Sequence, residues 1–164
     1  MKYLKGLGIY TEKLEISHYG IVKKGLNNLV NNEVVRIVSC SNVIPLKRID
    51  KIIDALAFLT EMKIEWTHFG DGTLLPEIKE KAKKLKDHVK TDFRGSVQHH
   101  EILDFYEKKS VNIFILTSET EGSGMAILEA QSYGIPAVVI GVGGVTDVVS
   151  TKTGIVLNPD AEGK

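Results

Sequence analysis

The sequence predicts an α/β fold, in which a parallel sheet is covered by helices on both faces. From residue 33 onward, aliphatic runs of strand length alternate strictly with amphipathic stretches of helical spacing. The strand-like runs are almost unbroken in aliphatic residues, which is typical of sheets that are buried on both sides. These two observations together indicate a Rossmann-like architecture.

The expected elements follow one another in regular order. The strands are expected at residues 33–41, 63–70, 88–95, 111–118, 135–141 and 153–159. Helices are expected between them, at residues 47–62, 73–86, 98–109, 124–134 and 144–150. In the helix at 47–62, isoleucine and leucine recur at helical spacing. The helix at 124–134 is stopped by Gly134 and the Ile135-Pro136 step that follows it.

The length of 164 residues fits one domain with a core of its own. Residues 1–32 are less regular, with one possible strand at 13–18, and we interpret them as a lead-in segment. Residues 33–164 are expected to form the domain itself. The chain contains no internal repeat and no low-complexity segment.

The composition excludes several classes of partner. Basic and acidic residues balance at 21 each, so nothing indicates attraction to nucleic acid or to a membrane surface. No apolar run approaches the length of a membrane span or of a secretory leader, so no integral membrane segment is expected. Cys40 is the single cysteine, which predicts a buried, inert thiol in a reducing compartment. We therefore expect a cytoplasmic protein.

The predicted fold places the loops that follow the strands at one edge. In open α/β sheets, ligands bind outside the carboxyl ends of the strands. The loops at residues 41–47, 70–72, 95–98, 118–124 and 141–144 all follow predicted strands and therefore share this rim. Gly122 and Gly124 let the backbone approach a ligand closely at the start of a helix, where free amides favour an anion such as phosphate. Gly143 and Gly144 offer either a second such site or a tight turn.

Charged side chains on this rim suggest what the ligand contains. Glu121 and Glu129 flank the first glycine loop, and carboxylates accept bidentate hydrogen bonds from vicinal diols. Lys47 and Arg48 follow the first strand and could neutralise a diphosphate. The pattern therefore predicts a phosphate flanked by hydroxyl-rich groups, such as a nucleotide sugar.

Five segments carry a resemblance to a known family. In chain order they resemble the donor-binding half of family 4 glycosyltransferases (glycosyl transferases group 1), which are retaining enzymes of the GT-B fold. The similarity is greatest to enzymes that build bacterial surface polysaccharides. It covers roughly residues 33–159 and is carried by "SNVIPLKRIDKIIDAL", "FGDGTLLPEI", "FRGSVQHHEILDFY", "SETEGSGMAILEAQSYGIPAVV" and "VGGVTDVV…TGIVL".

The resemblance implies a role for each rim residue. Glu121 would contact the hydroxyls of the donor sugar, and Glu129 the ribose diol. Lys47 would pair with the diphosphate, and Glu121, Lys47 and Arg48 are the expected catalytic residues. The family usually has an arginine where this chain has Asn42, and Arg48 is expected to supply that charge. Sugar, phosphate and base would be held by the remaining donor-binding residues, Gly70, Val97 (near the base), Gly122, Ser123, Gly124 and Met125.

Histidines give a weaker signal. His99 and His100 are adjacent on a predicted helix and point about 100° apart, so a capping or surface role is favoured over a metal site. His68 lies in a predicted strand and is expected to pack in the core. No metal and no cofactor are expected beyond the nucleoside diphosphate sugar, which would be the substrate.

We therefore expect an enzyme that transfers a hexose-type sugar from a nucleoside diphosphate sugar to a saccharide or a lipid-linked acceptor. The resemblance implies an acceptor-binding domain that this sequence does not match, so the isolated domain is expected to be inactive. It also allows a place at the inner face of the membrane for the full-length enzyme. Two alternatives remain open, a nucleotide-sugar epimerase or hydrolase on the same architecture and a noncatalytic, doubly wound interaction domain.

Overall fold

The computed structural model describes residue 12 and residues 20–27 and 33–159. The possible strand at 13–18 and most of the lead-in segment lie outside the described residues. The described strands are β1 (Val34–Cys40), β2 (Lys63–Phe69), β3 (Val89–Gly95), β4 (Ile113–Leu116), β5 (Ala137–Ile140) and β6 (Gly154–Leu157).

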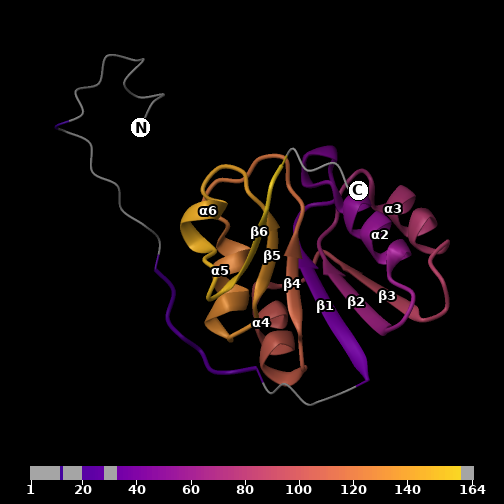
Figure 1. Ribbon diagram of the computed structural model, residues 1–164, viewed down its shortest axis with the longest axis horizontal. Coiled ribbons are helices and arrows are strands. Elements are labelled where there is room, and N and C mark those ends of the chain that lie inside the picture. Colours follow the sequence, from indigo (N-terminus) through magenta and orange to yellow (C-terminus); the bar gives the residue numbers. More distant parts are fainter. Residues whose placement is uncertain (1–11, 13–19, 28–32, 160–164) are drawn as a thin grey trace.

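These strands form one sheet in the order β3-β2-β1-β4-β5-β6, and every neighbouring pair is parallel. The chain therefore builds the sheet outward from β1 to one edge, returns to β4 and builds to the other edge (Figure 1). This arrangement confirms the predicted Rossmann-like parallel sheet. The loops after β1 and β4 start from adjacent strands, at the point where the direction of building reverses.

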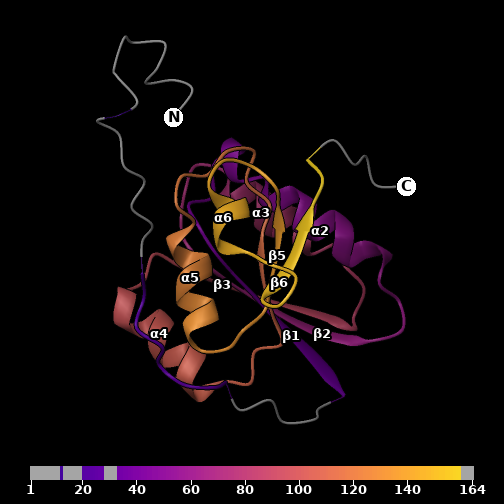
Figure 2. The same ribbon diagram turned by 60° about the vertical axis from the view of Figure 1, so that its left-hand side comes forward.

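Helices cover both faces of the sheet, as predicted. The helices are α2 (Ile49–Phe58), α3 (Leu75–Ala82), α4 (His99–Lys108), α5 (Met125–Ser132) and α6 (Val145–Val148), and a 3-10 turn, η2 (Pro45–Lys47), precedes α2. Helices α2 and α3 lie on one face and α4, α5 and α6 on the other (Figures 1 and 2).

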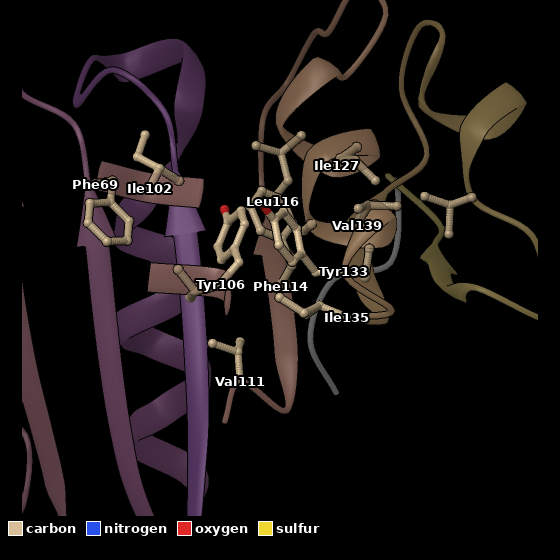
Figure 3. Packing of buried hydrophobic residues seen from close by; sticks show 14 of the residues in the cluster. Phe69, Ile102, Tyr106, Val111, Phe114, Leu116, Ile127, Tyr133, Ile135 and Val139 are labelled. Carbon is tan, nitrogen blue, oxygen red and sulfur yellow. The ribbon is translucent and has the colours of Figure 1, made fainter. Parts of the chain in front are cut away.

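Each face has its own hydrophobic core. On the α2–α3 face, Trp66 is packed among aliphatic side chains of both helices. On the opposite face, Tyr106 of α4 meets Tyr133 edge to face at a centroid distance of 5.8 Å, beside Phe114 of β4 (Figure 3). Tyr106 and Phe114 are fully buried. Burial of this kind contributes about 25 cal/mol for each Å² of apolar surface, and it fixes α4 and α5 against the sheet.

Several expected boundaries were wrong. The helix expected at 47–62 begins at Ile49, because Arg48 adopts a left-handed conformation that interrupts helical geometry. It ends at Phe58, after which Leu59 is extended. The helix expected at 73–86 is likewise shorter and spans Leu75–Ala82.

The described part of the lead-in segment is bound to the domain. Residues 20–27 run past α5 (Figures 1 and 2). The amide of Lys24 donates to the carbonyl oxygen of Ser132 at 3.0 Å, and that of Asn27 to Tyr133 at 2.6 Å. The Asn27 side chain also donates to the carbonyl of Val111 at 2.7 Å. Within the described residues, no helix is both long and apolar enough to cross a membrane.

Candidate nucleotide-sugar site

The loop between β1 and α2 brings Lys47 to the carboxyl end of the sheet. Pro45–Lys47 form one 3-10 turn, after which Arg48 adopts φ 47° and ψ 44°. A left-handed conformation costs a non-glycine residue roughly 1–2 kcal/mol. The loop therefore holds a strained backbone turn where it presents two adjacent cations, and strain of this kind is common at functional sites.

Lys47 and Glu121 form an ion pair across two loops. Nζ of Lys47 lies 2.7 Å from Oε2 of Glu121, and the Ser118 hydroxyl donates to the same oxygen at 3.1 Å. The two charged side chains are only 18% and 19% exposed, so solvent screens the pair weakly. Both bonds fall on Oε2, so Oε1 of Glu121 accepts no bond described here. The structure thus brings together two of the residues that the sequence assigned to one ligand.

Further hydrogen bonds join the same two loops. The Thr117 hydroxyl lies 3.0 Å from the carbonyl oxygen of Lys47 and 2.8 Å from that of Arg48. The amide of Glu119 donates to the carbonyl of Leu46 at 2.9 Å. These bonds hold the loop after β1 and the loop after β4 as one unit, which explains how Arg48 keeps its strained conformation.

Arg48 is engaged by carboxylates. Its guanidinium donates to both oxygens of Asp50 at 3.2 and 3.1 Å and to Glu119 at 2.7 Å. These bonds raise the pKa of Arg48. Burial acts to raise the pKa of Asp50, but the bond from Arg48 lowers it on balance. Arg48 also borders a hollow of about 320 Å³ beside α3, which Lys47 and Glu121 do not line. Its expected role in a phosphate clamp stays a prediction.

The glycine loops touch each other. Gly124 has φ 61° and caps the start of α5. A Cβ on Gly143, which has φ 56°, would lie 1.9 Å from the carbonyl oxygen of Glu121. One on Gly144 would lie 2.2 Å from that of Gly122. Glycine is therefore required where the loop after β5 supports the loop after β4.

This contact decides between the two interpretations of the second loop. The amide of Gly144 donates to the carbonyl of Gly122 at 3.1 Å, so this amide is already used within the protein. Helix α6 spans only Val145–Val148 and adds little dipole. The structure favours the tight turn, and it leaves the loop at 122–124 as the candidate anion cradle.

Glu129 has a partner that sequence reasoning missed. Oε1 of Glu129 on α5 lies 2.9 Å from Nε2 of His99, the first residue of α4. Glu129 is 16% exposed, whereas His99 is 64% exposed. The sequence favoured a capping or surface role for His99 over a metal site. A contact across 30 positions leaves no local signal in the sequence.

The other expected donor-binding residues lie on the rim or under it. Asn42 is exposed directly after β1. Gly70 follows β2 and approaches Ser41 so closely that a Cβ would lie 1.9 Å from its carbonyl oxygen. Val97 is half-buried and packs against the core beneath α4. Ser123 is also half-buried, and Met125 is 40% exposed at the start of α5.

Two residues were expected in the core, and the structure buries His68 fully but Cys40 only partly. Burial, with the charge of Glu129, raises the pKa of the Cys40 thiol to about 11, which disfavours the reactive thiolate. His68 is fully buried, as expected. No group of three or more metal-ligating side chains lies together within the part of the chain that the structure describes.

A larger hollow lies away from this rim. Its volume is about 700 Å³, and it opens over the polar face of β1–β3, beside the connection from α4 to β4. Its lining includes Arg36, Glu65 and Lys90 but neither Lys47 nor Glu121. We place the candidate site on the rim, because the glycine loop, Lys47 and Glu121 meet there.

The parallel sheet with helices on both faces places this chain in the class of doubly wound α/β domains. The sequence model of the family "Glycosyl transferases group 1" matches residues 27–162. The chain belongs to that family.

Curated relatives agree with this assignment. The chain is 32% identical over 117 residues to sulfoquinovosyl transferase SQD2 of Arabidopsis thaliana, which covers 69% of this chain and 21% of that protein. It is 29% identical over 105 residues to the O-antigen biosynthesis glycosyltransferase WclY of Escherichia coli, covering 61% of this chain and 27% of that one. The matched region is thus about a quarter of the length of these relatives.

Solved structures share the fold. The apo form of the lipopolysaccharide outer core galactosyltransferase WaaB superposes with a TM-score of 0.84 at 22% identity, over 98% of this chain and 46% of that one. The Anabaena protein Alr3699/HepE in complex with UDP-glucose superposes with a TM-score of 0.62 at 24% identity, over 79% of this chain and 36% of that one.

Proposed function

We propose that this domain binds the nucleoside diphosphate sugar of a retaining glycosyltransferase that transfers a hexose-type sugar to a saccharide or lipid-linked acceptor. The main observation in support is that Lys47 and Glu121 form an ion pair beside the glycine loop, at the carboxyl edge of the sheet. Nζ of Lys47 lies 2.7 Å from Oε2 of Glu121. A cation that can bind a diphosphate is therefore adjacent to a carboxylate that can bind sugar hydroxyls. In a nucleoside diphosphate sugar, the diphosphate and the sugar are adjacent in the same way.

Lys47 acts on the leaving group in this proposal. Its ammonium group turns from Glu121 to the diphosphate, or bridges the two, when the ligand enters. Positive charge fixed near the departing diphosphate stabilises the negative charge that develops there. The amides at the start of α5, beyond Gly124, add to the same effect. No metal is needed for this stabilisation in the proposal.

The carboxylates orient the two sugars. Oε1 of Glu121 is the oxygen that accepts no described bond, and it is the proposed acceptor for donor-sugar hydroxyls. Glu129 lies eight residues after Glu121, about one turn into α5, and is the proposed acceptor for the ribose diol. The names of the relatives support a donor of this class, since HepE is described in complex with UDP-glucose. Family membership favours transfer over the epimerase, hydrolase and noncatalytic alternatives.

The acceptor is proposed to be held by a second domain. A transfer reaction requires the acceptor to be in attack geometry beside the anomeric carbon, with water excluded. The rim described here is one wall of such a site. The resemblance of the chain to the O-antigen biosynthesis glycosyltransferase WclY supports a saccharide acceptor. A cytoplasmic location, at the inner face of the membrane for the full-length enzyme, is part of the same proposal.

Two substitutions test the division of roles between the carboxylates. Glu129→Gln should weaken binding of the bare nucleoside diphosphate, because the ribose contact does not depend on the sugar. Glu121→Gln should spare the bare nucleotide and weaken the nucleotide sugar. A lost hydrogen bond to a charged group costs about 1.5–3 kcal/mol, which is about tenfold or more in affinity.

Titration calorimetry or NMR with UDP and UDP-glucose measures both effects, and Glu107→Gln on α4, which lines the distant hollow, is the matched control. Equal effects of the two substitutions on both ligands would contradict the assignment. If Glu121→Gln and Glu129→Gln bind both ligands as tightly as Glu107→Gln does, the binding site does not lie on this rim.

A further inference from the structure

The contact between His99 and Glu129 joins two helices at the rim. Nε2 of His99 lies 2.9 Å from Oε1 of Glu129, and the residues are 30 positions apart. Glu129 is largely buried, while His99 is mostly exposed. No role proposed so far uses the imidazole, although it touches the carboxylate assigned to the ribose.

The direction of this hydrogen bond is fixed by chemistry. An ionised carboxylate has no proton to donate, so Nε2 of His99 must carry the hydrogen. A carboxylate offers about four lone-pair positions. The imidazole occupies one of them on Oε1, and enough remain for two hydroxyl groups of a diol. The histidine can therefore stay bound to Glu129 while the carboxylate accepts the ribose.

Both partners stand on rigid elements. Helix α4 is anchored by Ile102 and Tyr106 in the core, and its start is fixed by the bond from the Gln98 amide to Glu101 at 2.9 Å. On α5, the carbonyl of Glu129 accepts a bond from the Ser132 hydroxyl at 2.7 Å. Because α4 and α5 are both fixed, the hydrogen bond from His99 restricts the rotamer of the Glu129 carboxylate. Supporting residues preorganise a binding group in this way.

We propose that His99 is a positioning residue for the ribose carboxylate: it holds Glu129 in the rotamer that accepts the diol of the nucleotide. This inference rests on the proposed function of Glu129. The imidazole acts through the carboxylate and need not touch the nucleotide. Without it, the carboxylate keeps its charge but gains rotamer freedom that ligand binding must then restrict.

The test uses the whole chain, with UDP as the probe, because HepE is described with UDP. His99→Ala should weaken UDP binding by about three- to tenfold, the effect of one modest hydrogen bond. His99→Gln should recover most of the affinity, since a glutamine amide can donate to the same oxygen. His100→Ala is the matched control, because His100 is the exposed neighbour on the same helix.

The preference of the protein for ribose over deoxyribose gives a second measurement. A purely structural role of His99 would leave this preference unchanged. The loss caused by His99→Ala should be clearly smaller with 2′-deoxyuridine diphosphate, which offers Glu129 one hydroxyl fewer. In the Glu129→Gln background, His99→Ala should have little further effect, since coupled residues are not additive.

Three results would overturn the inference: UDP affinities of His99→Ala and His100→Ala that agree, equal losses with the ribose and deoxyribose probes, or full additivity with Glu129→Gln. A different result, in which Glu129→Gln itself leaves UDP binding unchanged, would overturn the proposed role of Glu129 and with it the inference that depends on it.

Discussion

At the scale of single residues, two adjacent cations have different surroundings. Lys47 faces one carboxylate, Glu121, and the loop that starts α5. Arg48 is held by two carboxylates, Asp50 and Glu119, and its backbone is strained. Charge alone made the two residues equivalent in the sequence. In the structure the two side chains have different partners, because the left-handed turn at Arg48 lies between the loop that carries Lys47 and the start of α2.

We therefore expect the two cations to respond differently to substitution. Lys47→Ala should weaken UDP binding by tenfold or more and leave uridine binding nearly unchanged, because only UDP has the diphosphate. Arg48→Ala should have a smaller effect on UDP, because its guanidinium is held by two carboxylates and borders a separate hollow that Lys47 and Glu121 do not line. Calorimetric titration of both ligands against both variants measures this. If uridine binding falls as much as UDP binding in Lys47→Ala, the lysine is not on the phosphates.

A second residue-scale feature is the buried polar network beneath the rim. The indole of Trp66 donates to the Ser39 hydroxyl at 2.9 Å, and that hydroxyl lies 2.8 Å from Nδ1 of His68. The Ser39 hydroxyl therefore links Trp66 to His68, and it has both a proton and a second lone pair with which to bond Nδ1. Nε2 is buried beside Gly70 and lacks a well-formed hydrogen bond. Burial lowers the pKa of His68 to about 4.

This shift predicts a pH dependence of stability. The folded-state pKa of His68, about 4, lies below the ordinary value of 6.5, so the unfolded chain binds more protons between these values. The free energy of unfolding should therefore rise with pH over this window, by about 3 kcal/mol in total from this group, and then level off.

Urea unfolding at several pH values measures that slope. His68→Gln should flatten it, whatever its effect on overall stability, and His100→Gln at an exposed site should not. An unchanged slope in His68→Gln would show that other groups cause the pH dependence.

At the scale of elements, the sequence located every helix and strand of the domain but not the turns that shape the site. Aliphatic periodicity reports which face of an element is buried, and it does so from neighbours in the sequence. The left-handed turn at Arg48 and the contact of Gly143 with Glu121 depend on residues about 70 and 20 positions away. The helix boundary at Ile49 and the choice between a tight turn and a second anion site could not be predicted for that reason.

The contact between the glycine loops predicts an asymmetry between two glycines. Gly143→Ala should destabilise the domain by about 2 kcal/mol or more, because its Cβ would overlap the carbonyl of Glu121 and its φ is positive. Gly122→Ala should change the free energy of unfolding little, since nothing lies within 4 Å of its Cβ position. Thermal or urea unfolding compares them. Equal destabilisation by the two substitutions would contradict the described packing of these loops.

At the scale of the whole molecule, strand order explains why the site is where it is. The chain reverses its direction of building between β1 and β4, and the loops that follow these two neighbouring strands carry Lys47 and Glu121. The sequence predicted that these loops share a rim, because the carboxyl ends of parallel strands lie at one edge. It could not predict that His99 reaches Glu129, because that contact depends on how α4 and α5 pack against the sheet.

The central claim is that the carboxyl rim of the sheet binds a nucleoside diphosphate sugar. Amide chemical-shift mapping of the chain during titration with UDP-glucose tests it most directly. We expect the largest shifts in the loops at residues 41–48 and 117–124 and at the start of α4, with small shifts around the hollow beside Arg36 and Lys90. Binding that shifts residues around that hollow, or none at all at millimolar ligand, would contradict the account.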